Sequence, residues 1–188
     1  MKQKFFAALM GLCFSFSVHA ANPVVEMKTN FGSITLELYA DKAPKTVANF
    51  LSYVKSGHYA GLIFHRVIDN FMIQGGGYDT QLREKETAGQ IPNEANNGLK
   101  NETYTIAMAR TSAPHSATAQ FFINLKSNDD LNHTAPNRYG WGYAVFGKVV
   151  KGQDVVMKIA KTRVGAQGPF SSDVPKQTVV IEEMKLLP

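Results

Sequence analysis

One apolar stretch of the chain, FHRVIDNFMIQGGG at residues 64–77, contains two polar residues that could do chemistry, Arg66 and Gln74. Arginine stays charged at physiological pH and presents several N–H donors in a rigid plane. In an extended strand, alternation would place Phe64, Arg66 and Ile68 on one face. The pattern predicts an apolar surface with one strong hydrogen-bond donor, which suits a reaction that needs only a dry pocket and that donor.

Other catalytic patterns are weaker. The glycines at 75–77 lack the lysine and the following serine or threonine of a phosphate-binding loop, and a tight turn or a close backbone approach explains them better. The histidines show no familiar metal-ligand spacing, and His65 is predicted to be a structural strand residue that points away from Arg66. Asp129 and Asp130 are adjacent in a polar loop, whereas glycoside hydrolysis needs opposed carboxylates. No nucleophile, metal site or acid–base pair stands out.

The elements that would carry this surface are mostly short strands. Alternating apolar and polar residues predict a strand at 33–39, paired in a hairpin with residues 24–29. Further strands are predicted at 62–68, 71–76, 104–110, 121–125, 143–150 and 178–187. Only two helices are predicted, an amphipathic one within 43–57 and a shorter one at 153–160. This pattern favours a mostly β protein with a closed antiparallel barrel over alternating strand–helix units.

The first twenty residues have the pattern of a secretory signal. Two lysines precede an apolar run at 5–18, and Val18-His19-Ala20 offers small residues at the spacing that signal peptidase reads. The run is too short to span a membrane. We therefore predict a signal peptide at 1–20, cleavage after Ala20, and a single domain at 21–188.

Cysteine content and charge narrow the class of protein further. The only cysteine, Cys13, lies in the predicted signal, so the predicted mature chain has no disulfide and no cysteine-based metal site. The formal net charge is +5; without Lys2 and Lys4, 18 basic residues stand against 15 acidic ones and the net charge is +3. The basic residues are scattered, so a nucleic-acid or membrane-surface protein would rest on the pI alone.

Several long motifs, in order, identify a family. Residues 64–77 are followed by IAMAR at 106–110, SATAQFFINL at 116–125 and YAVFGKVV at 143–150. Together they closely resemble the cyclophilins, which are peptidyl-prolyl cis–trans isomerases, and the resemblance begins with FGSITLELYADKAPKTVANF at 31–50. It implies a closed eight-stranded antiparallel β-barrel capped by two α-helices. The signal and loop pattern are most similar to the periplasmic cyclophilins of Gram-negative bacteria, so a periplasmic location is expected.

The resemblance also implies a site and a role for its members. Arg66 would be the catalytic donor to the prolyl nitrogen, with no cofactor, no metal and no covalent intermediate. The residues expected to bind the substrate are Phe71, Met72, Gln74, Ala109, Arg110, Thr111, Gln120, Phe122, Leu131 and Tyr143. The expected partners of a monomeric enzyme are unfolded or partly folded proline-containing proteins, with no nucleic acid and no membrane insertion after signal removal. A periplasmic chaperone that grips proline-containing segments without isomerising them would use the same groove.

Three positions depart from the best-known cytosolic cyclophilins. Asp130 stands where they have tryptophan, Arg110 where they have asparagine, and Tyr143 where they have histidine. In the family, cyclosporin binds across the groove, and that tryptophan supplies a hydrogen bond and an apolar face. Asp130 supplies neither, so cyclosporin resistance is expected unless Trp141, in the loop 132–142, folds back over the groove instead of packing the loop.

Overall fold

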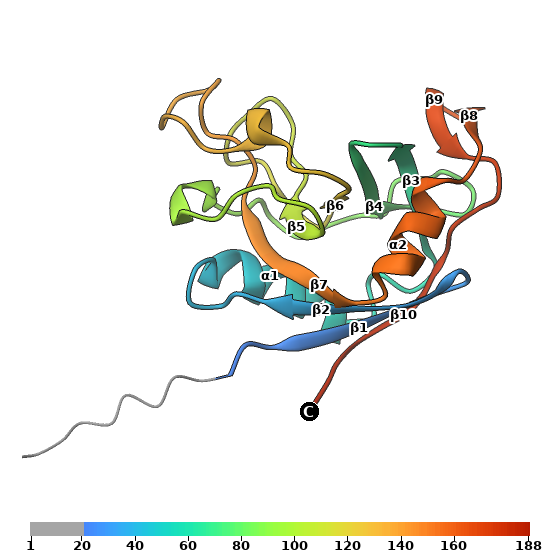
Figure 1. Cartoon of the computed structure of the whole chain (residues 1–188), viewed down its shortest axis with the longest axis horizontal. Helices are drawn as coiled ribbons and strands as arrows, with labels where there is room; N and C mark the ends of the chain where they lie inside the picture. The colour runs from blue at the N-terminus through green and yellow to red at the C-terminus, as the bar shows by residue number, and fades with distance from the viewer. Residues whose placement is uncertain (1–20) are drawn as a thin grey trace, which may run out of the picture.

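An eight-stranded antiparallel sheet, curled nearly into a closed barrel, forms most of the protein (Figure 1). The computed structural model describes residues 21–188, so Cys13 and the predicted signal peptide lie outside the described residues. The strands are β1 (Val24–Thr29), β2 (Gly32–Leu38), β3 (Leu62–Ile68), β4 (Met72–Asp79), β5 (Thr105–Met108), β6 (Phe121–Asn124), β7 (Val145–Lys151) and β10 (Ile181–Leu186). They follow the order β10-β1-β2-β7-β5-β6-β4-β3. Backbone hydrogen bonds from Phe64 to Val179 (3.0 Å) and from Gly61 to Ile181 (2.9 Å) join the two edge strands, which confirms the predicted barrel.

Two helices pack against the barrel, as predicted. Helix α1 (Pro44–Lys55) has proline in its first turn, where the missing N–H costs nothing, and buries one face in the core. Its Phe50 ring lies 5.1 Å from Phe146 and 5.8 Å from Phe121 between ring centroids. Helix α2 (Gln153–Ala160) follows Gly152, which adopts a positive φ of 88°. Within residues 21–188, no helix has both the length and the apolar character needed to cross a bilayer.

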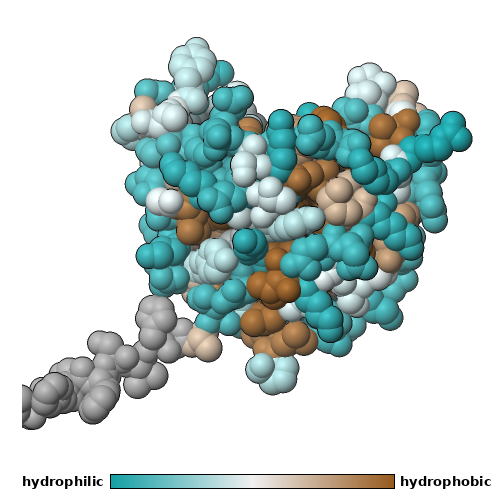
Figure 2. Space-filling model, viewed as in Figure 1, coloured by the Kyte–Doolittle hydropathy of each residue, from teal (hydrophilic) through white to brown (hydrophobic). Residues whose placement is uncertain are grey.

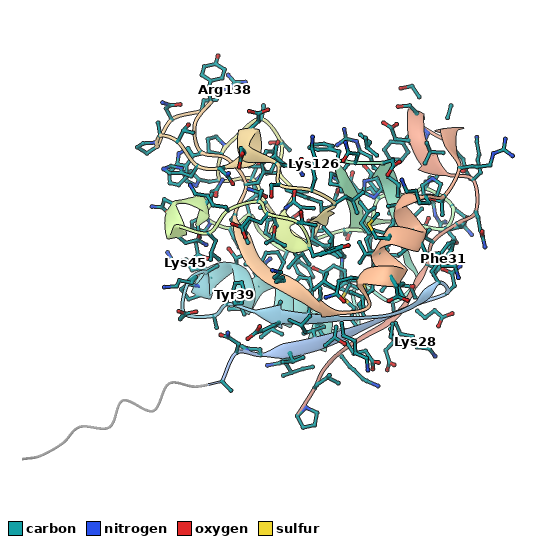
Figure 3. All side chains as sticks on the ribbon, in the orientation of Figure 1. Lys28, Phe31, Tyr39, Lys45, Lys126 and Arg138 are labelled. Carbon is teal, nitrogen blue, oxygen red and sulfur yellow. The ribbon has the colours of Figure 1, made fainter. Side chains whose placement is uncertain are left out.

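Several short elements were not predicted. Strands β8 (Val164–Gln167) and β9 (Phe170–Pro175) form a separate hairpin, and two 3₁₀ turns, η1 (Ala95–Asn97) and η2 (Asp129–Leu131), lie in the long polar loops. The hairpin and the loop 132–142 project from the barrel (Figure 1). Figure 3 places the labelled Arg138 at the outer end of that loop, and the surface is hollowed between the two projections (Figure 2).

A β-bulge in β3 changes which side chains share a face. Phe64 pairs with Gly75 and Arg66 pairs with Gln74, so β3 has one extra residue, His65, between two consecutive pairs with β4. As a result, Phe64 is buried in the barrel core whereas Arg66 is exposed. The prediction that Phe64 and Arg66 share a face was therefore wrong. The prediction that His65 points away from Arg66 was also wrong, because both residues line one cavity.

Candidate active site

A cavity of about 330 Å³ on the barrel wall gathers the residues expected at the site. Those that line it are Arg66, Phe71, Met72, Gln74, Ala109, Arg110, Gln120, Phe122, Leu131 and Tyr143. The remaining one, Thr111, lies in an adjoining cavity of about 310 Å³, with which the first shares Gln74, Ala109, Arg110 and Gln120. The structure thus brings all the predicted site residues to two connected hollows, but it keeps Thr111 out of the one that contains Arg66.

The apolar part of this cavity is a cluster separate from the barrel core. It combines buried side chains, Met72 and Phe122 among them, with the partly buried Phe71, Leu131 and Tyr143. The rings of Phe122 and Tyr143 meet edge to face at 5.6 Å and 81°. Because strand β6 directs Phe121 into the core, the alternating Phe122 faces outward into this cluster. The result is a small apolar hollow on the outer wall of the barrel.

A chain of buried asparagine side chains holds two walls of the hollow. Asn128 Nδ2 donates to the backbone oxygen of Phe71 at 2.9 Å and to Asn124 Oδ1 at 2.7 Å. Asn124 Nδ2 donates to Asn101 Oδ1 at 3.2 Å, and Asn101 Nδ2 donates to the backbone oxygen of Leu131 at 3.0 Å. Buried amides with satisfied partners fix the backbone from which Phe71 and Leu131 project. The sequence analysis missed this chain, because isolated asparagines in separate segments form no pattern.

Arg66 forms the polar edge of the cavity. Its Nη1 lies 3.5 Å from Gln74 Oε1, which is long for a hydrogen bond, and Gln74 Nε2 donates to Gln120 Oε1 at 3.0 Å. No ion pair in residues 21–188 involves Arg66. A neutral amide therefore lies beside the guanidinium, and most of its N–H donors are free to meet a substrate.

The three glycines after Gln74 allow the neighbouring strand to approach closely. Gly76 adopts φ +83°, and a Cβ there would lie 2.9 Å from the Phe121 ring. A Cβ at Gly77 would lie 2.5 Å from Cδ of Gln120, so the Gln120 side chain crosses directly over this backbone. The predicted close approach is confirmed, and it explains how Gln120 comes within reach of Gln74.

Two of the positions that depart from the cytosolic cyclophilins contact each other. The Arg110 guanidinium carbon lies 4.5 Å from the centroid of the Tyr143 ring, within the range of a cation–π contact. Arg110 Nε also donates to the backbone oxygen of Gly142 at 2.9 Å. Together these contacts hold Arg110 against the cavity wall.

Three residues that sequence reasoning missed also line the cavity, namely His65, Tyr78 and Phe170. The bulge in β3 turned His65 toward the cavity, and Phe170 belongs to the hairpin that was not predicted. Tyr78 directly follows the motif at 64–77, and its position there as an aromatic residue is the only signal in the sequence that could have suggested it. Within the described part of the chain, no three His, Cys, Asp or Glu side chains are grouped so as to hold a metal ion.

Residues 24–186 match the family model described as cyclophilin type peptidyl-prolyl cis-trans isomerase/CLD. The chain belongs to the cyclophilin family. This cyclophilin is 59% identical over 163 residues to a peptidyl-prolyl cis-trans isomerase of Streptomyces antibioticus, covering 87% of this chain and 98% of that relative. It is 54% identical over 161 residues to peptidyl-prolyl cis-trans isomerase B of Escherichia coli, covering 86% and 98%.

Solved structures agree with this assignment. The crystal structure of a cyclophilin type isomerase from Cryptosporidium parvum superposes with a TM-score of 0.71 at 26% identity, over 89% of this chain and 98% of that one. The cyclophilin is therefore a peptidyl-prolyl cis–trans isomerase, and its nearly closed barrel with two helices is the fold of the family.

The environment of His65 makes the cyclophilin sensitive to acid. The residue is 3% exposed, and burial, followed by the charge of Arg66, lowers its pKa from 6.5 to about 4. Between those values the unfolded chain binds more protons than the folded one, so stability falls as the pH drops. Between pH 7 and pH 5, His65 alone should lower the free energy of unfolding by about 2 kcal/mol.

Denaturant unfolding of the wild type and of His65→Phe at both pH values measures this effect. The phenylalanine ring keeps the packing against Tyr78, whose centroid lies 4.6 Å from that of His65. Between pH 7 and pH 5, the free energy of unfolding of the variant should therefore fall by about 2 kcal/mol less than that of the wild type. Burial also lowers the pKa of His58, but that residue is common to both proteins, so equal losses would contradict the lowered pKa of His65.

Proposed function

We propose that this isomerase turns X–Pro bonds with Arg66 as its electrostatic donor, and that its clients are exported proteins during their folding. One observation carries the proposal: an uncompensated guanidinium and a small apolar hollow open into the same cavity. The hollow is lined by apolar side chains, as a pyrrolidine ring requires. The donor lies at its edge, where the adjoining amide bond of the peptide would pass.

The chemistry of the X–Pro bond explains why these two features suffice. Rotation must break amide resonance, with a barrier of roughly 18–20 kcal/mol, and uncatalysed exchange takes on the order of 10–100 s. In the twisted transition state the prolyl nitrogen becomes pyramidal and gains a localised lone pair. A guanidinium N–H that donates to this lone pair forms an interaction absent from the planar ground state, so it lowers the barrier selectively. A dry apolar pocket further favours the less polar twisted amide.

The remaining site residues would hold an extended peptide. Phe71, Met72, Phe122 and Leu131 would enclose the proline ring, while Gln74 orients Arg66. Gln120 and the segment 109–111 would hydrogen-bond the peptide backbone beside the ring. A structure of the Cryptosporidium parvum isomerase was determined in the presence of the dipeptide Ala-Pro, and that chain aligns with a TM-score of 0.69 at 26% identity, which supports an X–Pro ligand.

An assay on a short prolyl peptide tests the proposal against simple binding. The chain 21–188 should accelerate cis-to-trans conversion of the peptide at concentrations far below that of the peptide. A protein that only grips proline-containing segments would leave the exchange rate unchanged. Loss of the acceleration on replacement of Arg66 would connect the activity to the cavity.

The location of these clients follows from the pattern of residues 1–20. A charged start, an apolar run and Val18-His19-Ala20 support export and a periplasmic location for the mature enzyme. Cleavage after Ala20 would leave the barrel intact, because β1 begins at Val24 and the nearby Pro23 oxygen accepts a backbone hydrogen bond from Leu38 at 2.9 Å. The mature monomer would then act on unfolded or partly folded proline-containing chains.

Intact-mass measurement of the protein exported by a Gram-negative host should find a chain that begins at Ala21. Replacing Ala20 by phenylalanine puts a bulky side chain where signal peptidase reads a small one, so this variant should accumulate as the precursor. A wild-type exported species that still carries Met1 would contradict both the cleavage site and the periplasmic proposal.

A further inference from the structure

Three aromatic side chains form one wall of the Arg66 cavity, and the isomerase mechanism does not use them. They are His65 from β3, Tyr78 from β4 and Phe170 from β9, here called the aromatic wall. Ring centroids lie 4.6 Å apart for His65 and Tyr78, 5.5 Å for His65 and Phe170, and 5.1 Å for Tyr78 and Phe170. All three line the same cavity as Arg66.

The aromatic wall lies on the far side of Arg66 from the apolar hollow proposed to hold the proline, here called the proline hollow, which is formed by Phe71, Met72, Phe122 and Leu131. Strand β4 carries Met72 of the hollow, then Gln74, which pairs with Arg66, and then Tyr78. At about 3.3 Å per residue, Met72 lies roughly 7 Å to one side of Gln74, and Tyr78 lies up to about 13 Å to the other. A peptide whose proline fills the hollow would therefore reach the wall within a few residues, since an extended chain spans about 3.3–3.6 Å per residue.

The position of Phe170 favours contact with a ligand over a purely structural role. Its neighbours in the hairpin, Pro169 and Ser171, are exposed, and Val164 on the paired strand is 41% exposed. Val174 at the other end of β9 is buried at 2% exposure, whereas Phe170 packs against His65 and Tyr78 near the tip of the hairpin. Phe170 and Tyr78 nevertheless remain only partly buried, so both rings keep surface that faces the cavity.

The three side chains of the wall are themselves uncharged. Burial and the charge of Arg66 lower the pKa of His65 to about 4, and burial and then Glu84 raise the pKa of the Tyr78 hydroxyl. The adjoining cavity, which shares Gln74 and Gln120 with this one, is lined by polar residues such as Thr87 and Gln90, and by Glu84, whose backbone forms a β-bridge with Tyr78. A peptide arm that enters the adjoining cavity would thus meet polar groups, and an arm that passes Arg66 along β4 would meet aromatic rings.

We propose that the aromatic wall is a substrate subsite that accepts an aromatic or large apolar side chain in the peptide arm that leaves the proline hollow past Arg66. A phenyl group there would stack on Phe170 and Tyr78 in offset or edge-to-face geometry. The inference rests on the proposed use of the Arg66 cavity for X–Pro peptides. It would make this isomerase prefer prolines that have an aromatic residue nearby on that side.

Two series of short prolyl peptides test the subsite. One series places alanine, leucine or phenylalanine after the proline, and the other places them before it. The wild type should show a ratio of kcat/KM for phenylalanine over alanine of about 3- to 10-fold in one of the two series, the yield of one good aromatic contact. In that series Phe170→Ala should bring the ratio close to one. Phe170→Leu, which keeps the hairpin packed, should give an intermediate ratio.

Val164→Ala is the matched control, because it shortens an exposed side chain of the same hairpin and should keep the wild-type ratio. A wild type that isomerises all the peptides equally, or a Phe170→Ala variant that keeps the full ratio, would overturn the subsite and leave the isomerase mechanism standing. A wild type that accelerates none of the peptides would instead overturn the proposed use of the cavity itself.

Discussion

Replacing Arg66 by alanine is expected to lower kcat/KM for a prolyl peptide by about 10²–10³-fold, as the loss of one preorganised donor does in other enzymes. The guanidinium is exposed at the cavity edge, makes no ion pair within residues 21–188, and lies beside the neutral amide of Gln74. Its removal therefore leaves no buried partner without a counterpart, and the stability of the fold should change little. The expected loss lies in the chemical step, because the donor acts on a lone pair that forms only in the twisted state.

Two further variants complete this test: one separates the shape of the donor from its charge, and the other is a control at an arginine outside the cavity. Arg66→Lys keeps the positive charge but replaces the rigid fork with a mobile ammonium, so it too should be impaired. Arg163→Ala removes an exposed arginine that does not line the cavity, and it should retain wild-type activity. Circular dichroism and denaturant unfolding confirm that each variant is folded. Near-complete activity of a folded Arg66→Ala would rule out the proposed mechanism.

The predicted fold succeeded where one face of an element meets the core. Strand β2 buries Ile34, Leu36 and Leu38 completely, so its alternating pattern is visible in the sequence. Hairpin β8–β9 was missed because β8 has no buried residue and β9 buries only Val174 and Pro175 at its end, so neither strand shows an alternating pattern. The periodicity of apolar residues indicates which face of an element is buried. It therefore cannot reveal an element that buries little of its surface.

The candidate site was predicted less completely for a related reason. The motifs named residues that the structure gathers around one cavity, because the motifs form neighbouring strands: Arg66 of β3 pairs with Gln74 of β4, and Gln74 pairs with Phe122 of β6. The orientation of His65 was wrong because a β-bulge depends on the register between β3 and β4, which composition does not reveal. The asparagine chain beneath Phe71 joins segments that are far apart in the sequence, so only the three-dimensional structure shows it.

Cyclosporin should inhibit this isomerase about 30- to 1,000-fold more weakly than it inhibits family members with tryptophan before the pocket leucine, a loss of about 2–4 kcal/mol. Asp130 precedes Leu131 in the turn η2, and it is exposed. Its carboxylate has no N–H donor for the macrocycle, and covering it with apolar surface would cost desolvation. A prolyl peptide depends mainly on Arg66 and the hollow, so catalysis should persist at drug concentrations that stop the tryptophan-containing enzymes.

Trp141 does not replace the missing ring in this structure. It packs between two histidines, with ring centroids 4.8 Å from His115 and 5.1 Å from His133, and it is absent from the lining of the Arg66 cavity. Inhibition titrations should therefore give the same weak affinity for wild type and Trp141→Ala, whereas Asp130→Trp should recover part of the lost affinity. Tight inhibition of the wild type that disappears in Trp141→Ala would show that the loop 132–142 brings Trp141 into contact with the drug. The predicted cyclosporin resistance would then be wrong.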